Sequence, residues 1–184
     1  MQTRRGVEPG DIAPEFNLSN ANEKVGGSDV DLKNVVADGG GVIMFTCNHC
    51  PYVVASEGRI EEVAEMARAS GLGFIGINSN DPEKYPTDNW ENMVKRAEKG
   101  MSYPYLHDAS QHVAASYGAE RTPEFYLVSN EGNVIYRGRL DDSPRDPSSA
   151  STSELADAIR EYVSGQRISV PRTDSIGCSV KWKN

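Results

Sequence analysis

The stretch Val42-Ile43-Met44-Phe45-Thr46-Cys47-Asn48-His49-Cys50-Pro51 joins an apolar run to a helical pattern. The apolar run predicts a buried strand, and Pro51 suits the first turn of a helix, where its missing N–H costs nothing. Cys47 and Cys50 form a C-x-x-C pair at this junction. Unpaired backbone N–H groups at a helix start favour negative charge, so a cysteine there loses its proton more easily. The stretch therefore predicts a reactive thiol between a strand and a helix.

The residues after the junction alternate between helical and extended patterns. Glutamates and arginines surround apolar residues at helical spacing up to Ser70, and Gly71 ends that helix. Thr87 or Asp88 is expected to cap a second helix, through about Lys99. Its predicted buried residues are Trp90, Val94 and Ala97. Other expected elements are a strand over 72–77, an extended segment over 103–106 and a helix over 110–117.

The ends of the chain carry turn signals and short strands. Asn130-Glu131-Gly132-Asn133 predicts a turn between strands over 125–128 and 134–139. Further expected elements are a short strand within 11–18, a loop or loose hairpin over 20–31, a helical turn over 32–36, a final helix capped by Thr152 or Ser153, and an irregular tail over 164–184. This order predicts an α/β fold with a central mixed sheet and helices on both faces.

Length and charge limit the classes of function. The 184 residues suit one domain, and the net charge of −8 argues against nucleic acid or an anionic membrane as partner. Apolar runs are too short to span a membrane. Residues 1–10 have two arginines but no apolar segment behind them, so we expect no signal peptide and a cytoplasmic protein. There, a C-x-x-C is typically catalytic or metal-binding.

The order of elements, the C-x-x-C and Thr122-Pro123 before the hairpin together resemble the thioredoxin-like fold. The opening Gly10-Asp11-Ile12-Ala13-Pro14-Glu15-Phe16 is similar to the N-terminal extension of the redoxin and AhpC/TSA branch, which includes TlpA/ResA-type oxidoreductases and peroxiredoxins. The stretches FTCNHCPY and IGCSVKW look like those of an uncharacterised family in this branch. The resemblance covers about 8–165. It implies a three-layer α/β/α domain over 1–184, with an N-terminal extension over 8–40, a core over 41–165 and a tail over 166–184.

The resemblance also implies roles for individual residues. Cys47 would be the attacking thiolate, and Cys50 the thiol that resolves the mixed disulfide. Pro123 would be the cis-proline facing the pair, and the Thr122 backbone would pair with an extended substrate segment. His49 is similar to the histidine of oxidising C-x-H-C members, where an imidazolium stabilises the thiolate. The implied activity is thiol–disulfide exchange with a protein or small-molecule disulfide and an external dithiol, without a resident cofactor or metal.

Two positions depart from the thioredoxin pattern. Thr46 takes the place of the usual tryptophan, and a glycine takes that of a buried aspartate in the preceding strand. Glu124 is therefore the remaining candidate for a proton-transfer carboxylate. A polar run, Asn78-Ser79-Asn80-Asp81, follows a strand at its carboxyl end, where functional loops gather. Helix capping explains that run equally well.

Other functions remain open beside disulfide exchange. A peroxiredoxin-like peroxidase would need Pro-x-x-x-Thr-x-x-Cys, and neither cysteine has it, although Arg121 could supply a guanidinium. A zinc site completed by His49 or Cys178 lacks a second C-x-x-C. A non-catalytic interaction module is a third class.

Cys178 lies in the tail, far from the pair in sequence. It is either a third thiol that folds back onto Cys47 or Cys50, or a cysteine without a redox partner.

Overall fold

The computed structural model describes residues 6–184. Its strands are β1 Asn17–Asn20, β2 Asp29–Asp31, β3 Gly40–Thr46, β4 Gly73–Asn78, β5 Tyr105–His107, β6 Arg121–Thr122, β7 Glu124–Ser129, β8 Val134–Gly138 and β9 Cys178–Ser179. Its α-helices are α1 Leu32–Val36, α2 Pro51–Ala69, α3 Trp90–Glu98, α4 His112–Tyr117 and α5 Glu154–Val163, and its 3-10 helices are η1 Pro86–Asp88 and η2 Pro147–Ser149.

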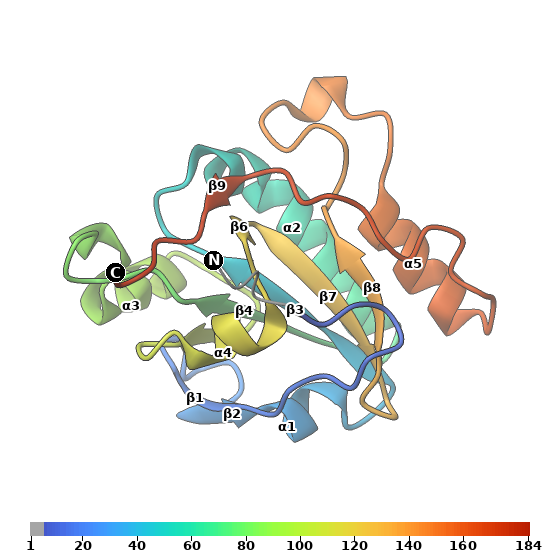
Figure 1. Cartoon of the computed structure of the whole chain (residues 1–184), viewed down its shortest axis with the longest axis horizontal. Helices are drawn as coiled ribbons and strands as arrows, with labels where there is room; N and C mark the ends of the chain where they lie inside the picture. The colour runs from blue at the N-terminus through green and yellow to red at the C-terminus, as the bar shows by residue number, and fades with distance from the viewer. Residues whose placement is uncertain (1–5) are drawn as a thin grey trace.

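Across residues 6–184 the main sheet has the strand order β2-β1-β5-β4-β3-β7-β8, and β6 and β9 form a separate pair. The central strand β3 runs parallel to β4 and antiparallel to β7 (Figure 1). The sheet is therefore mixed, as predicted. The C-x-x-C follows directly from the carboxyl end of its central strand.

Side chains of β3 alternate between two buried faces of the sheet. Ile43 and Phe45 face a core that includes residues of α1 and α4. Val42 and Met44 face the opposite core, which includes residues of α2 and α5. Met93 of α3 packs with Tyr105 in a smaller cluster. Helices thus cover both faces, and the predicted three-layer α/β/α arrangement is confirmed.

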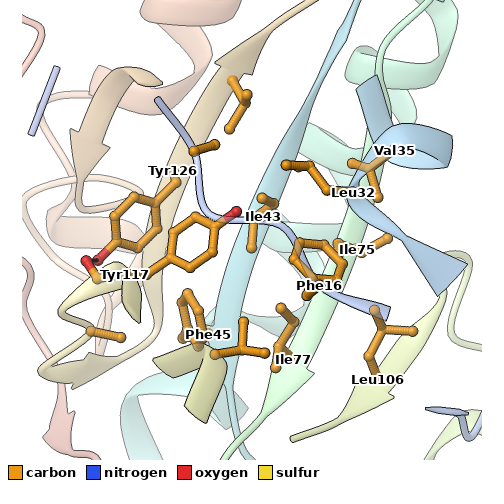
Figure 2. Close-up of a cluster of buried hydrophobic side chains, with 14 of the residues drawn as sticks. Phe16, Leu32, Val35, Ile43, Phe45, Ile75, Ile77, Leu106, Tyr117 and Tyr126 are labelled. Atoms are coloured by element: carbon orange, nitrogen blue, oxygen red, sulfur yellow. Dashed lines mark hydrogen bonds between the residues drawn. The ribbon is translucent and has the colours of Figure 1, made fainter. Parts of the chain in front are cut away.

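Figure 2 shows the aromatic rings of Phe45, Tyr117 and Tyr126 close together in one buried cluster. The ring centroids of Phe45 and Tyr117 are 5.6 Å apart, and those of Phe45 and Tyr126 are 5.7 Å apart. The buried hydroxyls have partners, because Tyr126 donates to the carbonyl of Tyr117 and Tyr117 donates to that of Pro14. Such ring pairs contribute about 0.5–1.5 kcal/mol each beyond area burial. They fix the end of β3 two residues before Cys47.

Two glycines let the short helix α1 approach the sheet closely. A Cβ on Gly41 would lie 2.6 Å from the carbonyl oxygen of Val35, and one on Gly73 would lie 2.2 Å from it. Contacts below 3 Å require the backbone to move, so a side chain at either position would push α1 away.

The second predicted helix starts later than expected. Asn89 is its N-cap and accepts a hydrogen bond from the N–H of Asn92, whereas Asp88 belongs to the separate turn η1 and is fully buried. Of the residues predicted to be buried, Ala97 is buried and Val94 is partly buried, but Trp90 is 37% exposed, and Met93, outside this set, is fully buried. Helix propensity predicted the helix but not its first residue, because Asp88 is buried in η1 and Asn89 caps the helix instead.

The N-terminal region forms a hairpin. The strand expected within 11–18 is instead β1, which pairs antiparallel with β2 and with β5. The side chain of Asn20 stabilises the hairpin loop by donating to the carbonyls of Asn22, Val25 and Gly27. The expected loose hairpin over 20–31 is confirmed, and it is better ordered than predicted.

The tail is not irregular throughout, contrary to prediction. Its segment β9 pairs antiparallel with β6, with Thr122 opposite Cys178. Helix α5 begins one residue after its N-cap, Ser153, as predicted. Within residues 6–184, none of the helices has both the length and the apolar character to cross a bilayer.

Candidate active site

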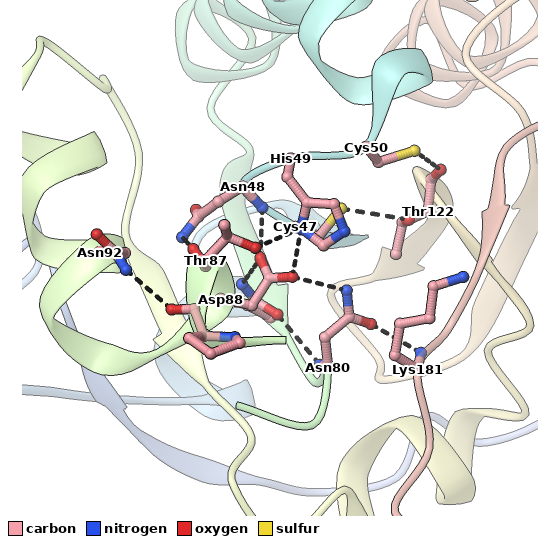
Figure 3. Close-up of polar contacts among 12 residues, drawn as sticks. Cys47, Asn48, His49, Cys50, Asn80, Thr87, Asp88, Asn92, Thr122 and Lys181 are labelled. Carbon is pink, nitrogen blue, oxygen red and sulfur yellow. Dashed lines mark hydrogen bonds and ion pairs between the residues drawn. The ribbon is translucent and has the colours of Figure 1, made fainter. Parts of the chain in front are cut away.

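Cys47 and Cys50 lie between the end of β3 and the start of α2 (Figure 3). Cys50 is the N-cap of α2, and Pro51 occupies the first turn. Thr122 lies opposite, and the Thr122-Pro123 peptide bond is cis. The predicted strand–helix junction and the predicted cis-proline are both confirmed.

Thr122 contacts both sulfur atoms. Its Oγ1 lies 3.5 Å from Cys47 Sγ, and its carbonyl oxygen lies 3.4 Å from Cys50 Sγ. Each cysteine is only 1% exposed. Both thiols are free and pack in the same buried cluster. The structure therefore brings together Cys47, Cys50 and Thr122, as the sequence predicted.

Hydrogen bonds give Cys50 the character of a thiolate. The bond from the Cys47 thiol lowers the pKa of Cys50, and further bonds come from Cys178 and from the N–H of Val53, so that its pKa is about 4. The Thr122 carbonyl opposes this, because it accepts only from a protonated Cys50. Several donors outweigh this one acceptor, and the helix start adds its own preference for negative charge.

Cys47 has the opposite character. Its hydrogen bond to Cys50 and its burial raise its pKa, and the Asp88 carboxylate raises it further, while the Thr122 hydroxyl lowers it. The two sulfurs thus share one proton, which lies on Cys47 when Cys50 is the thiolate.

Asp88 is a fully buried carboxylate beside Cys47. Its Oδ1 accepts from the N–H of Asn48 at 2.7 Å and from the side chain of Asn78 at 3.0 Å. Its Oδ2 accepts from Asn80 at 3.1 Å and lies 2.7 Å from His49 Nδ1. An ionised carboxylate has only acceptors, so this set of donors suits it. Asp88 therefore joins the C-x-x-C loop to the end of β4 through its hydrogen bonds.

His49 stands at the edge of the site. Its ring stacks on Tyr85, with centroids 6.1 Å apart and planes at 4°. Its Nδ1 lies 2.7 Å from Asp88 Oδ2 and 3.0 Å from the hydroxyl oxygen of Thr87. Asn48, His49 and Arg96 are among the residues lining a cavity of about 740 Å³ between α2 and α3. A molecule in this cavity would reach the imidazole first.

A second layer holds the loop in place. The Tyr105 hydroxyl donates to Asn48 Oδ1 at 2.6 Å. Arg96 donates to the Cys47 carbonyl and lies over the Tyr105 ring, 5.7 Å from its centroid. These contacts orient the backbone of the C-x-x-C rather than its sulfurs.

The auxiliary candidates from the sequence lie away from the sulfur chemistry. The buried Glu124 carboxylate is 3.1 Å from Arg137 and accepts from the Tyr126 hydroxyl, so its ion pair supports the sheet. Arg121 is exposed on β6. Thr46 is buried, and its hydroxyl has no hydrogen-bond partner in the part of the chain that the structure describes. Asp88, not Glu124, supplies the carboxylate beside Cys47.

Cys47, His49 and Asp88 could also hold a metal, because one donor atom from each lies within 4.8 Å of the others. Thiolate, imidazole and carboxylate are all zinc ligands. However, His49 Nδ1 and Asp88 Oδ2 are in direct contact at 2.7 Å, and an ion would have to separate them. The expectation of no resident metal stays a prediction.

Sequence reasoning missed Asp88, Arg96 and Tyr105. The polar run starting at Asn78 was the available signal, since Asn78 and Asn80 both bind the Asp88 carboxylate. Asp88 itself looked like a helix cap, because capping and burial use the same residue types.

Comparison with known proteins agrees with this architecture. An uncharacterized conserved protein from Geobacillus kaustophilus has 40% identity and a TM-score of 0.87, over 95% of this chain and 92% of that one. A hypothetical protein from Sinorhizobium meliloti has 31% identity and a TM-score of 0.87, over 97% of each. The peroxidoxin BcpB from Mycobacterium tuberculosis shares the fold, with 20% identity and a TM-score of 0.59 over 85% of this chain and 94% of that one.

No curated protein matches the chain. The Redoxin family model matches residues 8–154, which include the C-x-x-C, the cis-proline and the whole main sheet. With this match and the thioredoxin-like architecture, the chain is a thioredoxin-like redox protein that belongs to the Redoxin family.

Proposed function

We propose that this chain is a thiol–disulfide oxidoreductase in which Cys47 and Cys50 alternate between dithiol and disulfide. The observation that carries the proposal is the pair of buried thiols at the start of α2, both in contact with Thr122 beside the cis-proline. A shared proton leaves one thiolate to attack and one thiol close enough to resolve the product. The thiolate is the nucleophile in disulfide exchange.

The charge distribution favours Cys50 as the attacking sulfur. Family resemblance would give this role to Cys47, but the Asp88 carboxylate lies on the Cys47 side and disfavours a second negative charge there. Cys50 has the helix start and the Val53 N–H. We therefore assign attack to Cys50 and resolution to Cys47.

The proposed cycle balances electrons and protons. The Cys50 thiolate attacks a substrate disulfide, forms a mixed disulfide and releases the first substrate thiolate, which takes a proton from water. Cys47 then loses its proton and attacks Cys50 Sγ, which releases the second substrate thiolate and leaves a Cys47–Cys50 disulfide. An external dithiol returns two electrons to the pair and becomes a disulfide.

His49 and Asp88 would accept the proton from Cys47 in the resolving step. One donor atom of each lies within 4.8 Å of the others and of Cys47 Sγ. Asp88 would orient the imidazole and stabilise the imidazolium that forms, as a carboxylate does for a histidine base elsewhere. The substrate would be a protein or small-molecule disulfide.

The test compares wild type with Cys47→Ser and Cys50→Ser in reduction of insulin and of a small aromatic disulfide. We expect both variants to lose turnover, and only Cys47→Ser to accumulate a mixed disulfide with the substrate, seen by mass spectrometry. Accumulation in Cys50→Ser instead would reverse the roles. Full turnover in either variant would reject the proposal.

A peroxidase is the second candidate, because a Cys50 thiolate at a helix start could attack a hydroperoxide. That step gives Cys50 sulfenic acid and an alcohol or water, and Cys47 would then condense to the disulfide and water. Hydroperoxide consumption faster than disulfide reduction would favour this function. Stoichiometric zinc in fresh protein would favour a metal site, and inertness of all thiols would favour an interaction module.

A further inference from the structure

The tail of the chain returns to the active site after α5. In Figure 1 it crosses the molecule as β9, beside β6, and ends near α3. Thr122 and Cys178 are register partners in the β6–β9 pair. The segment that precedes the cis-proline is therefore already paired with a strand from the same chain.

Contacts of Val180 and Lys181 hold the tail in place. Val180 is buried against the core. The Lys181 carbonyl accepts from the N–H of Asp81 and from the Gln111 side chain, each at 2.8 Å, and its own N–H donates to Asn80 Oδ1 at 2.9 Å. Asn80 also donates a hydrogen bond to Asp88, so this one residue contacts both the tail and the active-site carboxylate.

Gly177 brings the tail close to Thr122. A Cβ at this position would lie 2.1 Å from the Thr122 carbonyl oxygen, which is the atom that contacts Cys50 Sγ. The edge of β6 is therefore filled by the tail, and another molecule could pair with Thr122 only after displacing it.

Cys178 brings a third sulfur to the pair. It packs against the cluster of Cys47, Cys50 and Val53, beside Thr122, which contacts both of the other sulfurs. Cys178 is half-buried, whereas the other two cysteines are almost inaccessible. Of the three sulfurs, Cys178 is therefore the most exposed.

We propose that Cys178 is a third redox-active thiol, which takes the disulfide from Cys47–Cys50 by forming Cys50–Cys178 and presents it to the external dithiol. This proposal rests on the proposed function, because it needs the Cys47–Cys50 disulfide as its starting state. It makes the tail the point at which the electrons of the external dithiol enter the buried pair.

The relay requires no additional oxidant. The Cys178 thiolate attacks Cys50 Sγ, the Cys47–Cys50 bond breaks, and Cys47 leaves as a thiolate that takes the proton lost by Cys178. The external dithiol then attacks Cys178 Sγ and releases Cys50 as a thiolate. Its second thiol frees Cys178 and completes the disulfide of the donor.

Charges favour Cys178 as the attacking group of the first step and Cys50 as the leaving group of the second. In the reduced chain, burial and the neighbouring Cys50 raise the pKa of Cys178 to about 11, while Lys181 and Arg121 lower it. In the disulfide state the Cys50 thiolate is gone, and the two cations remain. The low pKa of Cys50, about 4, also makes it a good leaving group when the donor attacks Cys178.

The test traps the second disulfide in full-chain variants that each lack one of the three cysteines. Cys47→Ser and Cys50→Ser are oxidised with diamide, blocked and digested with trypsin, which separates 34–59 from 173–181. We expect an intramolecular link between these peptides in Cys47→Ser, at least about tenfold more than in Cys50→Ser, because a disulfide needs adjacent Cβ atoms. Equal yields, or only intermolecular links in Cys47→Ser, would overturn the proposal.

A kinetic experiment separates this proposal from the proposed function. Cys178→Ser should slow re-reduction of the Cys47–Cys50 disulfide by a protein dithiol at least about tenfold, and by dithiothreitol much less, because only the bulky donor needs an accessible sulfur. Ser179→Ala is the matched control and should keep both rates. Unchanged re-reduction in Cys178→Ser would reject the relay and leave the two-cysteine function intact. Absence of disulfide exchange in wild type would reject the function itself.

Discussion

The two sides of the C-x-x-C differ in chemistry although they are three residues apart. On the Cys47 side, a buried carboxylate, amides and an imidazole come from β4, η1 and the loop itself. On the Cys50 side, the neighbours are a helix start, the Thr122 carbonyl and a third sulfur from the tail. Because both cysteines are equally buried, their different roles come from their neighbours and not from exposure.

Cys50→Ser should have the largest effect on activity of the substitutions that test this difference. We expect turnover to fall by about a thousandfold or more, because the change removes the proposed nucleophile. Ultraviolet thiolate absorbance should also disappear. In wild type the folded-state pKa of Cys50 is lowered to about 4, so this absorbance should persist above that pH and be lost as the pH falls through it.

Cys47→Ser is the matched control, and it should retain thiolate absorbance at neutral pH although the pKa of Cys50 rises without the Cys47 hydrogen bond. If absorbance were retained in Cys50→Ser but lost in Cys47→Ser, the thiolate would be Cys47 and not Cys50.

Asp88→Asn should have the second largest effect. Every neighbour of the carboxylate is a donor, so the new amide N–H₂ would face another donor, and the free energy of unfolding should fall by about 1–3 kcal/mol. The pKa of Cys47 should also fall, because a negative charge is removed. Urea unfolding and thiol titration measure the two effects. Asp38→Asn, at an exposed position, is the control; an equal loss of stability there would contradict the argument.

Gly177→Ala tests whether the tail shields Cys50 from solvent. The added methyl group would collide with the Thr122 carbonyl, so the tail should move away and alkylation of Cys50 should rise by about tenfold, as accessibility governs thiol reactivity. Gly58→Ala is the matched control, because a Cβ there meets nothing within 4 Å. If Cys50 were alkylated at the same rate in both variants, the tail would not be what covers it.

Thr122→Val should have the smallest effect. It removes the hydroxyl that lies 3.5 Å from Cys47 Sγ but keeps the carbonyl beside Cys50 and nearly the same side-chain volume. The hydroxyl lowers the pKa of Cys47, so its loss should raise that pKa slightly and change the dithiol–disulfide equilibrium by about threefold or less. Equilibration against glutathione measures the shift. A change of a hundredfold would mean that Thr122, and not Asp88, controls Cys47.

Predictions from the sequence were best where a local pattern decides the structure. The strand–helix junction, helix α2, the hairpin of β7 and β8 and the cap at Ser153 all follow from periodicity, a proline or a turn motif. The second helix was misplaced because Asp88 has two possible uses, capping and burial, and propensity does not distinguish them.

The sequence by itself determined that this protein has a C-x-x-C at a helix start, opposite a threonine–proline pair, in an α/β fold. These features are local, or they follow from the order of the elements. Only the tertiary structure decided which groups surround each sulfur. Asp88 reaches Cys47 from η1, and Cys178 reaches Cys50 because β9 pairs with β6. Contacts between residues so far apart in sequence depend on how the whole chain packs, and no local pattern encodes them.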